Sequence, residues 1–145
     1  MSRSLLDLAN DLEKKADKID GNASLAAVNV ALAIVGDLAY STPVDTSQAI
    51  SSWITTLDTP ADFKQGPYYP GEGGSTYRAS AAETINQAKA ALANKKPGQT
   101  IYITNNQPYI KRLNEGYSAQ EPAGFVERAI LIGRRVLQKF KLKGL

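Results

Sequence analysis

The stretch from Ala23 to Pro43, ASLAAVNVALAIVGDLAYSTP, decides the fold. Its apolar residues recur at steps of three and four on two neighbouring stripes, and Asp37 is its only charged residue. This spacing predicts a helix over about residues 23–40 with a wide apolar arc. Such a helix must be covered on more than one side, by the domain's own sheet or by another subunit. Pro43 ends it, because the residue before a proline is disfavoured in the helical region.

The residues before this stretch predict another helix. From Ser4 to Ile19, apolar side chains recur at steps of three or four between charged ones. This pattern predicts an amphipathic N-terminal helix within residues 1–20, with one buried stripe. The triplet 20–22, Asp-Gly-Asn, tolerates left-handed backbone angles and therefore predicts a turn between the two helices.

Two short segments have the composition and alternation of strands. Residues 51–58, which include Trp53, and residues 101–104 are rich in β-branched and aromatic side chains, as strands usually are. The chain therefore combines helices with a small sheet in an α+β fold. Its 145 residues fit a single domain over residues 1–145.

Two more helices follow from capping signals and apolar period. Ser80 with Glu83 three residues later is typical of a capping box, and the apolar period after it predicts a middle helix that ends before Pro97. Residues 124–145 begin with a helical apolar period whose polar positions are basic. They predict a basic C-terminal helix and tail.

Between the first strand and the middle helix, residues 59–77 are dominated by glycine and proline, with Tyr68 and Tyr69 among them. A loop of this length in a small domain is usually functional or disordered. Paired tyrosines offer large contacts at a low cost in conformational entropy. We expect an extended loop or hairpin arm that orders against a neighbouring subunit, and a loosely held tip is the alternative.

The composition excludes several kinds of chemistry. The chain contains no Cys and no His, which removes thiolate and imidazole ligands and the commonest catalytic base. Its carboxylates are scattered along the sequence, and the glycines of residues 71–74 lack the flanking residues of a phosphate-binding loop. No apolar run approaches the roughly 20 residues that cross a bilayer. We therefore expect no enzyme, cofactor, metal site or membrane partner.

The positive charge is concentrated at the C-terminal end, although the net charge is only +3. Six basic residues and no acid lie among the last eighteen residues: Arg128, Arg134, Arg135, Lys139, Lys141 and Lys143. Such an end can meet DNA phosphates, an acidic partner surface or only water. A DNA-binding module that uses the basic C-terminal helix is therefore the alternative function.

Two groups of residues carry a resemblance to a known family. The first group is Thr42, Pro43, Val44, Asp45, Thr46 and Ser47, followed by Ser51, Ser52 and Trp53. The second group is Asn105, Pro108, Tyr109, Leu113, Gly116, Gln120, Pro122, Gly124 and Phe125, in that order before the last helix. In order and rough spacing, this set resembles the small minor tail and neck proteins of long-tailed bacteriophages, which complete the tail or join it to the head.

The resemblance implies a small antiparallel sheet packed by a long helix, with loops that meet neighbouring subunits in a ring of six. It implies the tail tube and head connector proteins as partners and a place in the virion after assembly in the host cytoplasm. Separately, the basic C-terminal end would suit a ring with DNA passing through its lumen. Physically, most of the motif is architecture. Gly116 allows a left-handed cap, and Gly124 resets the chain so that Phe125 enters the core.

Overall fold

The computed structural model describes residues 4–43, 48–116 and 123–140. In chain order its elements are α1 (Leu5–Ser41), α2 (Gln48–Ser51), β1 (Ile54–Leu57), α3 (Tyr77–Leu92), β2 (Ile101–Thr104), α4 (Ile110–Asn114) and α5 (Phe125–Lys139). The predicted α+β class is confirmed: a long N-terminal helix, a middle helix and a C-terminal helix pack around a small antiparallel sheet.

The first helix differs from the prediction, because α1 is one unbroken helix of 37 residues and not two helices joined by a turn. The Ser4 side chain caps it by accepting a hydrogen bond from the Asp7 backbone N–H at 3.1 Å. The triplet 20–22 lies within the helix. A glycine inside a helix costs only about 1 kcal/mol relative to alanine, and the apolar period runs through Gly21 without a change of phase.

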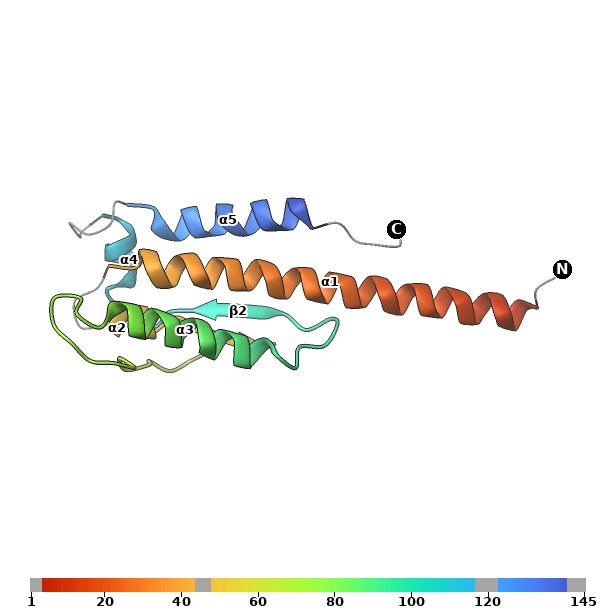
Figure 1. Cartoon of the computed structure of the whole chain (residues 1–145), viewed down its shortest axis with the longest axis horizontal. Helices are drawn as coiled ribbons and strands as arrows, with labels where there is room; N and C mark the ends of the chain where they lie inside the picture. Colours follow the sequence, from red (N-terminus) through yellow and green to blue (C-terminus); the bar gives the residue numbers. More distant parts are fainter. Residues whose placement is uncertain (1–3, 44–47, 117–122, 141–145) are drawn as a thin grey trace.

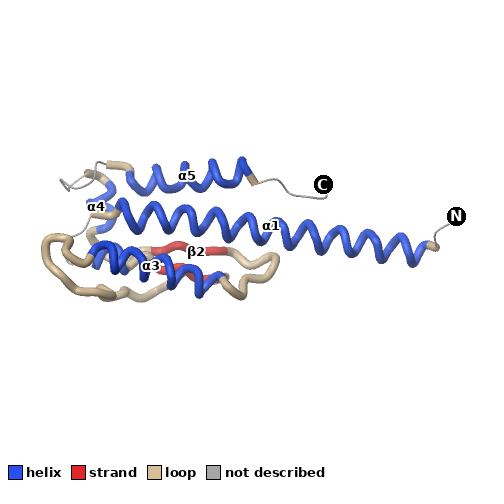
Figure 2. Tube along the Cα trace, in the orientation of Figure 1, coloured by secondary structure: helices blue, strands red, loops and turns tan. Residues whose placement is uncertain are grey.

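The C-terminal half of α1 lies between two layers (Figure 1, Figure 2). On one side lies α5, and on the other lie α3 and the two strands. The N-terminal half extends past both layers as a single helix (Figure 1). From residue 5 to residue 21, every residue except Asp11 and Ile19 is exposed. The wide apolar arc predicted for residues 23–40 is covered only in part by the chain's own elements, because Ala26, Ala31, Val35, Leu38 and Ala39 are buried while Leu25 stays exposed. Residues 5–20 do not have their predicted buried stripe.

The sheet has two antiparallel strands, with Ile54 opposite Thr104 and Leu57 opposite Ile101. The first strand is shorter than predicted, because residue 51 ends α2 and the strand begins at Ile54. Asp58 ends the strand with a φ of 67°. Its carboxylate accepts hydrogen bonds from the Thr100 backbone N–H at 3.2 Å and the Gln99 side chain at 3.0 Å, and so links the outer ends of the strands.

The middle helix α3 begins at Tyr77, and the predicted capping box at Ser80 is wrong. Ser80 is buried inside the helix, where its hydroxyl accepts a hydrogen bond from the Tyr69 backbone N–H at 3.3 Å. A serine followed by an acid three residues later gives the same local pattern at a cap and inside a helix. The tertiary contact with the preceding loop decides between the two.

Candidate assembly surface

The projecting half of α1 carries apolar side chains that no other described element covers. Leu5, Leu8 and Leu12 are all exposed, and their spacing of three and four residues places them on one face of the helix. We call these three residues the leucine stripe. A row of exposed leucines on one helical face is typical of a surface that binds another protein.

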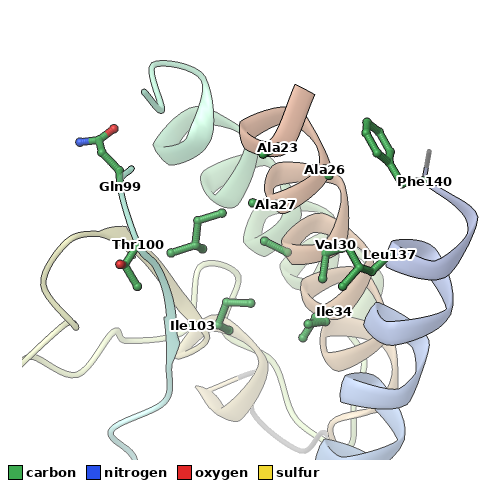
Figure 3. A pocket seen from close by; sticks show the side chains of 12 residues that line it. Ala23, Ala26, Ala27, Val30, Ile34, Gln99, Thr100, Ile103, Leu137 and Phe140 are labelled. Carbon is green, nitrogen blue, oxygen red and sulfur yellow. The ribbon is translucent and has the colours of Figure 1, made fainter. Parts of the chain in front are cut away.

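The leucine stripe continues in phase into the body of the molecule. After Ile19, the same steps of three and four lead to Ala23, Ala27, Val30 and Ile34, and these side chains line an open groove (Figure 3). One apolar face therefore follows α1 from its N-terminus to the packed core. Its first part is uncovered, and its second part forms a wall of the groove.

The groove has two further walls. The strand β2 contributes Ile101 and Ile103, and α5 contributes Leu137 near its C-terminal end. The volume is about 600 Å³, and only Gln99 and Thr100 among the twelve lining residues are polar. We call this space the apolar groove. It is open to solvent, and its lining offers few partners for a polar ligand.

The helix α1 is also long and apolar enough to cross a lipid bilayer. An 18-residue window within it has a mean hydropathy of 1.7, and 28% of that window is buried. The core helix of a globular protein meets the same criteria, because a helix covered on two sides is apolar over most of its surface. The expectation of no membrane partner therefore stays a prediction.

The Gly/Pro/Tyr loop, residues 58–76, lies against its own domain. The Ser51 hydroxyl accepts a hydrogen bond from the Tyr68 backbone N–H at 2.9 Å, and the Ser52 hydroxyl donates one to the Gln65 carbonyl at 2.7 Å. The Asn106 side chain donates to the Ala61 carbonyl at 2.8 Å. The predicted long loop is therefore confirmed, and these hydrogen bonds show that it is not a loosely held tip. Its ordering against a neighbouring subunit stays a prediction. Its buried serine and amide partners cannot be recognised from the loop's own sequence.

The first group of motif residues is structural where the structure describes it. The Trp53 indole N–H donates a hydrogen bond to the Thr42 hydroxyl at 2.8 Å, and that hydroxyl donates to the Leu38 carbonyl at 2.6 Å. All three residues are buried, as is Pro43. The pair fixes the exit from α1 against the start of β1. Val44, Asp45 and Thr46 lie outside the described residues.

The second group of motif residues meets the first in the core. The Asn105 side chain donates a hydrogen bond to the Ala49 carbonyl at 3.0 Å. Pro108 is exposed, and Tyr109 is the N-cap of α4. Leu113 packs against the core cluster that Leu38, Trp53, Phe125 and Ala129 form. Among the described motif residues, Trp53, Leu113 and Phe125 therefore share one core cluster.

The two motif glycines have the left-handed angles that the sequence predicts. Gly116 follows α4 with a φ of +95°, and Gly124 precedes α5 with a φ of +87°. Just before Gly116, at the end of α4, Asn114 has a role that the sequence does not reveal. Its side chain accepts a hydrogen bond from the Val126 backbone N–H at 2.9 Å and donates to the Glu127 carboxylate at 3.0 Å. Phe125 is fully buried, as predicted, and Pro122 lies outside the described residues.

The basic residues of α5 lie on its exposed side. Arg134, Arg135 and Lys139 are exposed, while the Arg128 guanidinium lies 3.9 Å from the Asp37 carboxylate of α1. Lys141 and Lys143 lie outside the described residues. The helix therefore presents positive charge to solvent.

Titratable groups give little sign of catalysis in the part of the chain that the structure describes. There, no group of three or more Asp or Glu could hold a metal ion. Burial raises the pKa of Tyr109 above 10.0, and burial together with the Glu83 carboxylate raises that of Tyr68. Both shifts favour the neutral phenol, so neither tyrosine is activated as a base or nucleophile.

The exposed leucine stripe and the apolar groove are absent from the functional residues that the sequence predicts. The signal that could have found the leucine stripe is the phase of the apolar period. If residues 20–22 formed a turn, the apolar positions before and after it would have no common helical phase. The steps of three and four instead continue unchanged across Gly21. No family model, curated protein or solved structure matches this chain.

Proposed function

We propose that this chain is a structural virion protein of a long-tailed bacteriophage. It assembles into a ring, of six copies by the family resemblance, that completes the tail tube or joins it to the head connector. It acts through complementary surfaces and not through catalysis. The observation that carries the proposal is the exposed leucine stripe on the projecting half of α1. An uncovered apolar helix face is costly in water and is relieved by association.

The resemblance and the fold support this function in different ways. The motif residues resemble those of tail and neck proteins, and they build the connections between α1, β1, α4 and α5. These connections hold α1 rigidly at its C-terminal end, so that its N-terminal half extends in a fixed direction. A fixed, projecting contact surface suits a subunit that must be placed at a set angle to its neighbour.

The test combines the purified protein with tail tubes that lack their completion protein. We expect ring-shaped particles in electron micrographs, a mass that is a multiple of 15.6 kDa, and density at one end of the tubes. Monomers at every concentration, together with bare tube ends, would refute the proposal. The variant L8E/L12E, which places charges on the leucine stripe, should form far fewer rings under the same conditions.

A second candidate function is DNA binding through α5, and the exposed Arg134, Arg135 and Lys139 favour it. Phosphate contacts of this kind make affinity fall steeply as salt rises. A gel-shift assay at low and moderate salt, with the charge-reversed variant R134E/R135E alongside, tests it. Tight, salt-sensitive binding that the variant loses would favour this function, and no binding at low salt would end it. The two functions are compatible, because a ring that surrounds DNA needs only positive charge on its inner surface and no residues that recognise the base sequence.

A further inference from the structure

We infer that the leucine stripe of one copy docks into the apolar groove of the next copy. This inference rests on the proposed ring-forming function and names the contact that would join neighbouring subunits. Each copy then donates one helix segment, residues 5–20, and offers one groove between α1, β2 and α5. The two surfaces are different, so the contact is heterologous and can repeat from subunit to subunit until a ring closes.

The occupant of the groove must come from another molecule. The leucine stripe and the Ala23 to Ile34 wall of the groove lie on the same unbroken helix. At 1.5 Å per residue, Leu8 and Val30 are roughly 33 Å apart along that helix. A rigid helix cannot fold back on itself, so the stripe of one chain cannot reach the groove of the same chain.

The chemistry of the groove favours an apolar helix over a small polar ligand. Ligand pockets usually place a few polar groups to fix the orientation of a small molecule. Here Gln99 and Thr100 are the two polar residues of the lining. The small side chains at Ala23 and Ala27 leave room for large ones from a partner, as the facing positions of packed helices do. Leucines at steps of three and four supply such side chains.

The two segments that carry these surfaces have opposite net charges. Residues 5–20 contain five acidic and three basic side chains, which gives a net charge of −2. The helix α5 contains four basic side chains and one acidic side chain, a net charge of +3. Arg134 lies one helical turn before the groove-lining Leu137. Opposite charges around an apolar contact favour the correct partner and speed its association.

The experiment measures the mass of full-length variants over a range of concentrations. The donor variant L8E/L12E puts charges on the stripe, where the exposed fractions are 47% and 58%. The acceptor variant L137E puts one at the groove, where Leu137 is 54% exposed. We expect the donor variant to weaken self-association at least about 100-fold, since losing the burial of one leucine costs roughly tenfold or more.

Two matched controls separate this contact from general effects of added charge. Leu6 is 69% exposed on the projecting half of α1 but off the stripe, and Leu131 is 50% exposed on α5 but outside the groove. L6E and L131E should therefore assemble as the wild type does. Because all substituted side chains are exposed, every variant should keep the wild-type circular dichroism spectrum.

Mixing the two defective variants gives the decisive result. The donor variant keeps an intact groove, and the acceptor variant keeps an intact stripe, so one functional contact forms between them. We expect two monomeric variants to combine into a dimer with one copy of each and to stop there. A mixture that stays monomeric, variants that assemble normally, or controls that lose assembly would each overturn the inference, as would a wild type that never self-associates.

The same variants distinguish failure of this contact from failure of the proposed function. If the wild type assembles through the stripe and groove but never binds tail tube ends, the contact stands and the phage function fails. If the donor and acceptor variants still form rings on tail tubes, the function stands and the contact is wrong. An independent readout uses the absence of native cysteine. The variant L8C/A27C should cross-link between copies with a thiol-reactive linker, whereas L6C/A27C should not.

Discussion

Trp53 and Thr42 are joined by a buried hydrogen bond that ties the end of α1 to the start of the sheet. Removing either side chain leaves the other without one of its hydrogen bonds. An unsatisfied buried polar group lowers the free energy of unfolding by about 1–3 kcal/mol. We expect T42V and W53F each to lower the free energy of unfolding. The double variant should lose less than the sum of both, with a coupling of about 1 kcal/mol.

Urea unfolding of the four proteins in this double-mutant cycle measures the coupling. The variant T104V is the control, because Thr104 belongs to β2 and is only partly buried. Strictly additive losses would mean that the indole and the hydroxyl do not stabilise each other.

Tyr68 gives a prediction about alkaline pH. Burial first, and the Glu83 carboxylate second, raise its pKa above 10.0. A raised pKa means that the folded protein holds this proton more tightly than the unfolded chain. The contribution is fully present below pH 10.0 and is lost as pH rises through the folded pKa.

We therefore expect the free energy of unfolding to fall more steeply above pH 10.0 in the wild type than in Y68F. Near neutral pH, the free energy of unfolding should change with pH in the same way in both proteins. Urea unfolding at a series of alkaline pH values measures it, and Y109F tests the same effect by removing a second phenol whose pKa is raised by burial. Parallel pH profiles for wild type and Y68F would contradict the prediction.

At the scale of the element, Gly21 tests whether α1 is continuous. An added methyl group at Gly21 would meet no atom within 4 Å, and alanine is about 1 kcal/mol more favourable than glycine inside a helix. We expect G21A to raise the helical signal and to raise stability by about 0.5–1 kcal/mol. Thermal unfolding followed by far-ultraviolet circular dichroism measures both.

Gly98 is the matched control, because its added methyl group also meets no atom within 4 Å, while its φ is +86°. Alanine in that left-handed conformation costs about 1–2 kcal/mol, so G98A should destabilise the protein. If G21A behaved like G98A, residues 20–22 would form the turn that their composition predicts and α1 would be two helices.

The helices and strands also show how much of the fold can be predicted from the sequence alone. Apolar period located α3, β2 and α5, and glycine chemistry located the left-handed residues 116 and 124, because these signals are local. The break at residues 20–22 and the capping box at Ser80 were wrong. In each case a local preference was overridden by contacts or by a helical phase that extends beyond a few residues. The groove could not be predicted, because it needs the relative placement of α1, β2 and α5.

At the scale of the whole molecule, α1 joins two regions of different local stability. Its C-terminal half is packed between α5 and the sheet, whereas residues 5–20 make their hydrogen bonds within one exposed helix (Figure 1). Exposed helical segments open locally at much lower free energy than packed ones. The projecting half should therefore have the lowest local stability within α1 in the monomer, and a partner's groove would raise that stability.

Hydrogen exchange makes this difference measurable. We expect the amides of residues 8–20 to exchange rapidly in dilute monomer, while those of residues 26–40 stay protected. On assembly, protection should rise in residues 8–20 and along β2 and the end of α5, which line the groove, and should stay unchanged in α3. The donor variant L8E/L12E should show the monomer pattern at every concentration. Rings in which residues 8–20 still exchange rapidly would show that the projecting half of α1 contributes nothing to the contact between subunits.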